Sequence, residues 1–330
     1  MKLGRIEAQG ADGAQARLVA VLPDRGWAID LAAAERLRLE RAGATTEAAR
    51  RIAVALFPPS MAAAIGAGEV FLEAAARAAA SDPGDASLAV GEARWLPPLD
   101  PPVMRDCLAF ERHLLNSFGR LNIPVPGVFY ELPIYYKGNP TTLLGHDAEV
   151  PWPSYSAHLD YELELGFVIG SGGRNLDPAR ARECIFGVTI FNDFSARDIQ
   201  SREMAGMLGP AKGKDFATAL GPWITTIDEL DVTRLDMAAR VNGEEWSRGV
   251  SGTMMWRPEE IVGYASKSEG VRPGELVGSG TVGNGCGLEL GKRLQPGDVV
   301  ELEVSGIGVL RNRLGQPEPK GWQPEARPRS

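Results

Sequence analysis

Apolar and polar residues alternate along much of the chain in short runs that glycine and proline separate. Residues 300–304 alternate Val or Leu with Glu, which is typical of a strand with one face in water. Residues 186–191 (FGVTIF) are apolar on both faces, as in a strand inside a core. Helical patterns are few, as at the alanine-rich residues 69–80 and at 258–266. The pattern predicts a mixed α/β fold that is predominantly β. Further strand-like runs lie at 16–22, 27–31, 159–170, 220–227, 237–246, 275–283 and 298–314.

A proline-rich segment divides this pattern. Residues 95–104 (WLPPLDPPVM) contain four prolines, which prevent a helix and stiffen the chain, so the segment is the best candidate for a linker. A chain of 330 residues is long enough for one large domain or two unequal ones. We therefore expect a smaller α+β accessory domain over residues 1–98 and a catalytic domain over residues 99–330.

Composition narrows the classes of function. The formal net charge of -8 gives no basic surface for nucleic acid. No run approaches the roughly 18 apolar residues that a membrane helix needs, and the start (MKLGRIEAQGADG) lacks the apolar stretch of a secretory signal. The three cysteines are widely spaced, which argues against disulfides and against a thiolate zinc site. We expect a cytoplasmic protein without nucleic-acid or membrane partners.

The strand-like run at 159–170 (LDYELELGFVIG) places Asp160, Glu162 and Glu164 on one face. Packed carboxylates repel one another unless a cation lies among them, and ligands that are all oxygen favour Mg²⁺, Mn²⁺ or Ca²⁺ over zinc. Asp193, at the end of the apolar run 185–191, is well placed to complete such a site. A solvated acidic strand face explains the spacing about as well, as it does for Glu301 and Glu303.

Candidates for acid–base chemistry and for substrate binding lie elsewhere in the chain. His113, in a short helical pattern, is a candidate base, although a surface or capped histidine is the commoner role for such a residue when it is considered alone. The glycine-dense residues 278–290 suit close backbone approach to a ligand or a tight connection between strands, and they carry Thr281 and Glu289. Side chains able to hold a carboxylate or an oxyanion are those of Tyr136, Arg197, Gln200 and Lys214.

Four passages over residues 104–315 together resemble the fumarylacetoacetate hydrolase family: DYELELGFVIG, IFGVTIFNDFSARDIQ, KGKDFATALGPW, and VGSGTVGNGCGLEL with LQPGDVVELEVSGIGVLRNRL. The resemblance implies a catalytic domain of the β-sandwich roll type, a homodimer, and a role in the catabolism of aromatic compounds. It also implies a bound Mg²⁺ or Mn²⁺, with Ca²⁺ possible. The metal ligands it implies are Glu162, Glu164 and Asp193, with Asp106, seven residues before His113, as a fourth.

The same resemblance assigns roles to the other candidates. It pairs His113 with Glu289 as the group that activates water. It implies that Arg197, Gln200 and Lys214 stabilise an oxyanion, and that Tyr136 and Arg120 bind substrate. Thr281, in the glycine-dense loop, is a further candidate for substrate binding. The chain departs from the family pattern at Asn116, where shorter members carry a glutamate, and at Met204, where the hydrolase carries a tyrosine.

These assignments lead to one expected function and two alternatives. We expect a metal-dependent hydrolase that cleaves a carbon–carbon bond in a small anionic 2,4-dioxo acid, such as an acylpyruvate or a fumarylacetoacetate-like acid. Water activated by His113 and Glu289 would attack, and an enolate stabilised by the metal would leave. The nearest alternative is a decarboxylase, isomerase or hydratase that uses the same enolate chemistry. The other is a non-catalytic metal- or ligand-binding member of the family.

Overall fold

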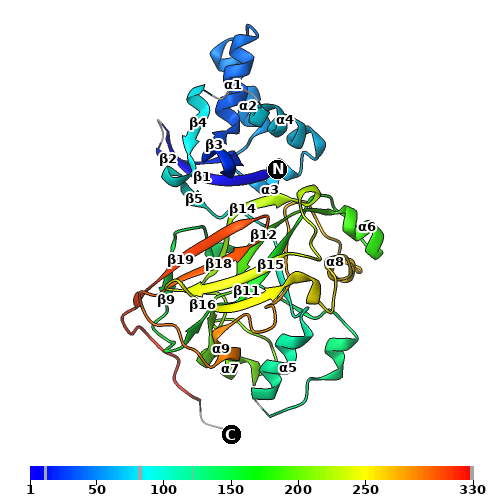
Figure 1. Ribbon diagram of the computed structural model, residues 1–330, viewed down its shortest axis with the longest axis vertical. Coiled ribbons are helices and arrows are strands. Elements are labelled where there is room, and N and C mark those ends of the chain that lie inside the picture. The colour runs from blue at the N-terminus through cyan, green and yellow to red at the C-terminus, as the bar shows by residue number, and fades with distance from the viewer. Residues whose placement is uncertain (11–12, 81–83, 121, 328–330) are drawn as a thin grey trace.

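The computed structural model describes residues 1–10, 13–80, 84–120 and 122–327. Figure 1 shows the N-terminal helices gathered at one end of the molecule and α5, α7 and α9 at the opposite end. Among the described residues, no helix is both long and apolar enough to cross a membrane. The helices are α1 (Leu31–Arg41), α2 (Thr46–Leu56), α3 (Met61–Ile65), α4 (Glu69–Ala80), α5 (Glu111–Arg120), α6 (Pro178–Glu183), α7 (Arg197–Met204), α8 (Pro258–Ala265) and α9 (Gly287–Leu290).

The N-terminal strands form one end of a large sheet, to which α1 to α4 add a helical layer. Side chains of Asp30, Thr45 and Ser60 accept hydrogen bonds from the first turns of α1, α2 and α3, which fixes where these helices begin. The strands, in their order in the sheet, are β4 (Ser87–Ala89), β3 (Trp27–Asp30), β2 (Gly13–Leu22) and β1 (Lys2–Gly10), with β5 (Arg94–Leu96) also paired to β1.

The sheet continues from β1 into the strands that carry the predicted chemistry. Lys2 and Leu3 of β1 pair with Thr225 and Ile224, so the N-terminal strands extend the same sheet. Its remaining strands follow in the order β14 (Thr218–Thr226), β12 (Ile185–Asn192), β11 (Leu163–Ile169), β17 (Leu276–Gly278), β6 (Met104–Cys107) and β7 (Tyr135–Lys137), and β8 (Leu143–Leu144) pairs with β14.

A second sheet covers one face of the first. Phe167 on β11 and Leu302 on β18 belong to the same buried apolar core, which lies between the two sheets as in a sandwich. The second sheet has the order β16 (Glu244–Val250), β15 (Asp236–Val241), β18 (Val299–Val304), β19 (Gly308–Pro317) and β9 (Glu149–Trp152). A short pair, β10 (Leu159–Asp160) and β13 (Ser195–Ala196), lies where the acidic segment begins.

The mixed α/β prediction is confirmed, with large sheets as its main feature. The alternation at 300–304 is also confirmed, because Val300, Leu302 and Val304 are buried while the glutamates between them are partly exposed. The start of the predicted linker differs from expectation, since β5 reaches Leu96 and pairs with β1. The boundary near residue 98 stays a prediction.

Candidate functional site

The acidic segment lies deep inside the molecule. Asp160, Glu162 and Glu164 are only 0–4% exposed, and Tyr161 and Leu163, which alternate with them, are fully buried. A solvated acidic face is therefore wrong for this strand. Burial of three carboxyl groups side by side is costly unless each is paired, hydrogen-bonded, protonated or bound to a cation.

Three carboxyl groups from strands of the large sheet come together here. One oxygen each of Asp106 on β6, Glu164 on β11 and Asp193 just after β12 lie within 4.8 Å of one another, and all three residues are buried. This is a donor set made only of oxygen, which Mg²⁺, Mn²⁺ and Ca²⁺ prefer. The geometry brings together three of the four predicted metal ligands.

The electrostatics of the three groups favour a cation. Burial and the neighbouring Asp193 raise the pKa of Asp106 to about 8. Burial, followed by repulsion from Asp106, raises the pKa of Glu164 well above its usual value, and burial also raises the pKa of Asp193. The buried Oε2 atom of Glu164 has no hydrogen-bond partner among the described residues. A hard dication would bind this oxygen and neutralise the repulsion among the three carboxylates, so the donor set fits such an ion.

Two residues that we expected to bind substrate, Tyr136 and Thr281, form hydrogen bonds with these carboxylates. The hydroxyl of Tyr136 donates to Asp193 Oδ2 at 2.6 Å, and the hydroxyl of Thr281 donates to Glu164 Oε1 at 3.0 Å. Any contact of Tyr136 or Thr281 with substrate stays a prediction. In this structure both side chains orient the carboxyl groups of the cluster.

Glu162 lies beside the cluster and is paired with two cations. Lys214 Nζ donates to Glu162 Oε2 and, at 2.5 Å, to Asp193 Oδ2, while Arg197 donates to Glu162 Oε1 at 2.9 Å. Burial alone would raise the pKa of Glu162, but Lys214 and Arg197 outweigh it and lower that pKa to about 2. Both oxygens of Glu162 are thus engaged, and its role as a metal ligand stays a prediction.

Arg197 is fixed by an aspartate whose role the sequence analysis missed. The guanidinium Nε donates to Asp160 Oδ2 at 2.8 Å, and Asp160 also accepts the backbone N–H groups of Gly287 and Leu288 at the start of α9. Gln200, one turn further along α7, accepts a hydrogen bond from Arg197 at 3.1 Å. The spacing at 160–164 indicated that Asp160 faces the site, but its partner lies on a distant helix.

The buried charges of the site do not balance by themselves. Carboxyl groups outnumber the two buried cations, Arg197 and Lys214, which are paired with Asp160, Glu162 and Asp193. Asp106 and Glu164 form no ion pair with any residue that the structure describes. These two groups are the ones that most need either protons or a dication.

The glycine-dense loop approaches protein carboxylates closely. A Cβ atom at Gly278 would lie 2.2 Å from Asp106 Oδ1, and one at Gly287 would lie 2.6 Å from Asp160 Oδ1. The N–H of Gly280, whose φ is +75°, donates to Asp106 Oδ1 at 3.0 Å. We expected the backbone of this loop to approach a ligand closely. In the structure it approaches the carboxylates of Asp106 and Asp160.

Gly278 provides a test of this packing. We expect Gly278→Ala to displace the Asp106 carboxylate and to weaken Mn²⁺ binding about tenfold or more, since one ligand would leave its place. Isothermal titration calorimetry measures the affinity. Gly91→Ala, outside the loop, is the control, because a Cβ there would meet no described atom within 4 Å. Equal affinity of Gly278→Ala and the natural protein would contradict the role of Gly278.

His113 and Glu289 meet, as the family resemblance implies. His113 Nδ1, on α5, lies 3.0 Å from Glu289 Oε2, on α9, although the ring N–H is not aligned on that oxygen. Both residues are more than nine-tenths buried. This pair, which we call the dyad, lies near the carboxylate cluster, since the charge of His113 helps to lower the pKa of Glu162. The assignment of His113 as the base stays a proposal.

Glu289 is held as a carboxylate by several donors. It accepts hydrogen bonds from Asn116 Nδ2 at 2.8 Å and from the N–H groups of Asn284 and Gly285 at 3.0 Å. Burial alone would raise its pKa, but His113 and these donors lower it. In the sequence, Asn116 was recognised only as a departure from the family pattern. Its position three residues after His113 on a helix could have indicated that it lies beside the His113–Glu289 pair.

Arg120, predicted to bind substrate, is engaged with the backbone. Its guanidinium donates to the carbonyl oxygen of Glu289 at 2.6 Å. That contact ties the end of α5 to α9 and so holds the two helices of the dyad together. A substrate contact of Arg120 stays a prediction.

The raised pKa values predict proton release on metal binding. Between about pH 4 and pH 8, Asp106 is protonated in the metal-free fold and ionised in the unfolded chain, so it lowers the stability of that fold as pH rises. A metal ion must displace this proton. We therefore expect Mn²⁺ affinity to rise with pH up to at least about pH 8. Calorimetry in two buffers of different ionisation enthalpy counts the protons, and heats that do not depend on the buffer would contradict the prediction.

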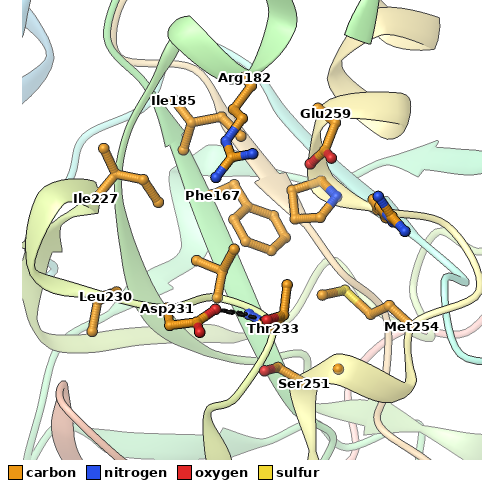
Figure 2. Close-up of a pocket in the computed structure, with 14 residues that line it drawn as sticks. Phe167, Arg182, Ile185, Ile227, Leu230, Asp231, Thr233, Ser251, Met254 and Glu259 are labelled. Atoms are coloured by element: carbon orange, nitrogen blue, oxygen red, sulfur yellow. Dashed lines mark hydrogen bonds between the residues drawn. The ribbon is translucent and has the colours of Figure 1, made fainter. Parts of the chain in front are cut away.

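One sizeable cavity lies away from these groups. It has a volume of about 590 Å³, and its lining includes Phe167, Arg182, Ile227, Met254 and Glu259. Figure 2 shows the guanidinium of Arg182 directed toward the ring of Phe167. Because side chains alternate along β11, Phe167 points to the face opposite Glu164. The cavity is therefore separate from the carboxylates. The candidate site is identified by its clustered side chains and not by this cavity.

Sequence comparisons match the part of the chain that carries these residues. Residues 103–315 match the family described as fumarylacetoacetate (FAA) hydrolase, C-terminal. An uncharacterised protein from Archaeoglobus fulgidus is 34% identical over 219 residues, which cover 66% of this chain and 81% of that protein.

Two solved structures have similar folds. One is a fumarylacetoacetate hydrolase from the psychrophile Exiguobacterium antarcticum, with a TM-score of 0.69 and 23% identity, covering 96% of this chain and 99% of that chain. The other is a 5-carboxymethyl-2-hydroxymuconate delta-isomerase from Mycobacterium smegmatis, with a TM-score of 0.67 and 24% identity, covering 97% of this chain and 100% of that one. At these identities the similarity establishes the fold alone.

Proposed function

The chain belongs to the fumarylacetoacetate hydrolase family, and from that premise we propose that it is a metal-dependent hydrolase of a small 2,4-dioxo acid. Members of this family are enzymes that act on small acids and generally bind a divalent metal. The observation that carries the proposal is the buried His113–Glu289 pair beside the carboxylates. A decarboxylation needs an electron sink but no group that activates water, so the pair favours hydrolysis.

The proposed site has two parts with separate tasks. Asp106, Glu164 and Asp193, with Glu162 as a further candidate, would hold Mg²⁺ or Mn²⁺. When bound, such an ion supplies Lewis acidity toward the oxygens of a dioxo acid and stabilises an enolate. Tyr136 and Thr281 hold Asp193 and Glu164 in place for that ion.

The side chains of the dyad would carry the proton. His113 would take a proton from water at its free ring nitrogen, because Nδ1 faces Glu289, and the Glu289 carboxylate would stabilise the resulting imidazolium. The hydroxide so formed would attack the carbonyl carbon distal to the acid group. Asn116 and the loop N–H groups keep Glu289 ionised, so it can do this throughout the reaction.

The cationic groups would bind negative charge on the substrate and on the oxyanion. Arg197 and Lys214 are buried and already aligned by Asp160, Glu162 and Asp193, which lowers the cost of ordering them when substrate binds. Gln200 lies within hydrogen-bonding distance of Arg197 and completes the set. Collapse of the oxyanion would break the carbon–carbon bond and release a carboxylic acid and a keto acid.

A second candidate is an isomerase or decarboxylase that uses the same enolate chemistry. The similarity in fold to an isomerase from Mycobacterium smegmatis supports keeping this possibility. The fold is shared by proteins that carry the names of hydrolases and of isomerases, so it does not distinguish the two. The two functions differ in their need for the dyad.

A substrate panel distinguishes these reactions. Acylpyruvates, fumarylpyruvate, fumarylacetoacetate and oxaloacetate are incubated with and without Mn²⁺, and products are identified by chromatography. We expect Mn²⁺-dependent cleavage of at least one dioxo acid into two acids. Isomerised or decarboxylated products alone would overturn the hydrolase proposal, and no turnover of any compound would favour a binding protein.

A cytoplasmic homodimer is part of the proposal. The resemblance to the family supports both the location and the assembly. Sedimentation equilibrium of the purified protein tests the assembly, and a mass near 35.4 kDa, that of one chain, would contradict it.

A further inference from the structure

A thiol lies against the proposed catalytic dyad and has no task in the hydrolysis. Cys286 is fully buried, directly before α9, and its Sγ lies 3.4 Å from Glu289 Oε2. One ligand atom each of His113, Cys286 and Glu289 lie within 4.8 Å of one another. Among the described residues this is one of two clusters of His, Cys, Asp and Glu with the spacing of a metal site.

The spacing of this cluster is close to that of a tetrahedral ion. Bonds of about 2.0 Å to nitrogen or oxygen and 2.3 Å to sulfur place neighbouring ligand atoms roughly 3.3 to 3.6 Å apart around zinc. The observed separations are 3.0 Å from His113 Nδ1 to Glu289 Oε2 and 3.4 Å from Cys286 Sγ to the same oxygen. These two separations are thus within a few tenths of an ångström of the values around zinc, and the third, between His113 and Cys286, is no longer than 4.8 Å.

The donor types of the two clusters select different ions. Asp106, Glu164 and Asp193 offer only oxygen, which suits Mg²⁺ or Mn²⁺. The second cluster offers an imidazole nitrogen, a sulfur and an oxygen, a mixture that suits Zn²⁺ and related transition ions. The two sites lie in one protein yet should not compete for the same metal.

Local charges are compatible with a second cation. Asp160 and Glu162 act on Cys286 together with Glu289, against the single guanidinium of Arg197. Burial raises the pKa of the Cys286 thiol well above its usual value, so the group is protonated and not a nucleophile while the site is empty. An ion that binds here takes the sulfur lone pair as the thiol proton leaves to solvent.

We propose that His113, Cys286 and Glu289 form a second metal site, selective for Zn²⁺ or a similar transition ion, whose occupation inhibits the enzyme. The ion binds Nδ1 of His113 as the ring proton moves to Nε2, and it also binds Glu289, so the pair no longer transfers a proton. Binding itself requires only the three side chains. The inhibitory effect rests on the proposed function, because it assumes that His113 and Glu289 act in the reaction.

Co²⁺ provides a direct test of binding. The protein is first saturated with Mg²⁺ to fill the oxygen site and is then titrated with Co²⁺ without substrate. A thiolate bound to Co²⁺ has a charge-transfer absorption in the near ultraviolet, which oxygen ligands do not produce. We expect one equivalent of this absorption in the natural protein, its loss on addition of Zn²⁺, and its absence in Cys286→Ser and Cys286→Ala.

Cys184→Ser is the matched control, because Cys184 is also a free, buried cysteine. It should keep the full absorption. Melting curves of all variants identify any that fail to fold, and the two Cys286 variants give independent chances of a folded protein. Absence of the band in the natural protein, or its persistence in a folded Cys286 variant, would overturn the second site.

Inhibition is then measured on the substrate that the panel identifies. We expect Cys286→Ser to need at least about tenfold more Zn²⁺ than the natural protein for half inhibition, each measured against its own zinc-free rate. Equal sensitivity would overturn the inhibitory role. A protein that gives the cobalt band but turns over no dioxo acid would refute the proposed function and leave the metal site standing.

Discussion

Replacing His113 by Gln should lower the turnover of the dioxo acid by about 10²- to 10⁴-fold at saturating Mn²⁺, the usual contribution of a general base. A glutamine fills much of the same space and can still donate to Glu289, but it cannot accept a proton from water at neutral pH. Steady-state kinetics with the substrate identified by the panel measure the effect. Mn²⁺ affinity should change little, because His113 is not among the three clustered carboxylates.

The chain offers a matched control for this substitution. His146 lies at the edge of the second sheet, where its Nδ1 accepts the backbone N–H of Arg311 at 3.1 Å. His146→Gln preserves an acceptor there and should leave turnover within about twofold, as is usual for a change away from buried networks. A small loss in His113→Gln, comparable to that in the control, would show that His113 is not the base.

Glu164→Gln should abolish Mn²⁺-dependent activity and, in the absence of metal, raise the melting temperature. The variant removes a charge-bearing ligand from the cluster, so the ion loses both a bond and its strongest neutralising partner. In the metal-free protein the same change relieves the repulsion that raises the pKa values of Glu164 and Asp106. Function and stability thus move in opposite directions, as is common for strained sites.

Scanning calorimetry with and without Mn²⁺ tests both halves of this prediction. The natural protein should melt at a higher temperature with Mn²⁺, and Glu164→Gln should gain nothing from the ion. Glu301→Gln is the control, because Glu301 has the same spacing to a second glutamate but lies on a partly exposed strand face. A Glu164→Gln protein that still gains stability from Mn²⁺ would contradict its role as a ligand.

Local pattern predicted much of the fold and part of the site. Strong apolarity was enough to bury residues 185–191 except the partly exposed Phe186, because burial of a strand depends on near neighbours. Alternation predicted one strand over residues 159–170, whereas the structure has β10 and β11 with Tyr161 and Glu162 between them. The helix at Glu69–Ala80 was predicted to the residue, since few other segments have its alanine content. The pairing of β5 with β1 was not predicted, because the two strands lie about ninety residues apart in the chain.

The hydrogen-bond partners of the site could not be predicted in the same way. The pairing of Arg197 with Asp160 joins α7 to the acidic strand, and the contact of Thr281 with Glu164 spans more than a hundred residues. Such contacts depend on how strands are ordered in the sheet. The family resemblance indicated which residues gather at the site, whereas only the structure gave the partner of each.

The geometry also changes the proposed roles of particular side chains. Lys214 lies between Glu162 and Asp193, so it acts on the carboxylates before any substrate arrives. Arg120 donates a hydrogen bond to the backbone of α9, and Asn116 donates one to the side chain of Glu289. The position at which the chain departs from the family pattern is thus part of the dyad's support, which explains why an asparagine there is compatible with a hydrolase of this arrangement.

The most direct test of the central claim is a crystal structure of the protein soaked in Mn²⁺, with anomalous diffraction recorded at the manganese edge. We predict one strong peak within about 2.0–2.3 Å of carboxylate oxygens of Asp106, Glu164 and Asp193, the bond length that such hard ions have to oxygen. A peak held by other residues, or no peak at saturating Mn²⁺, would contradict the claim that these buried acids form a metal centre.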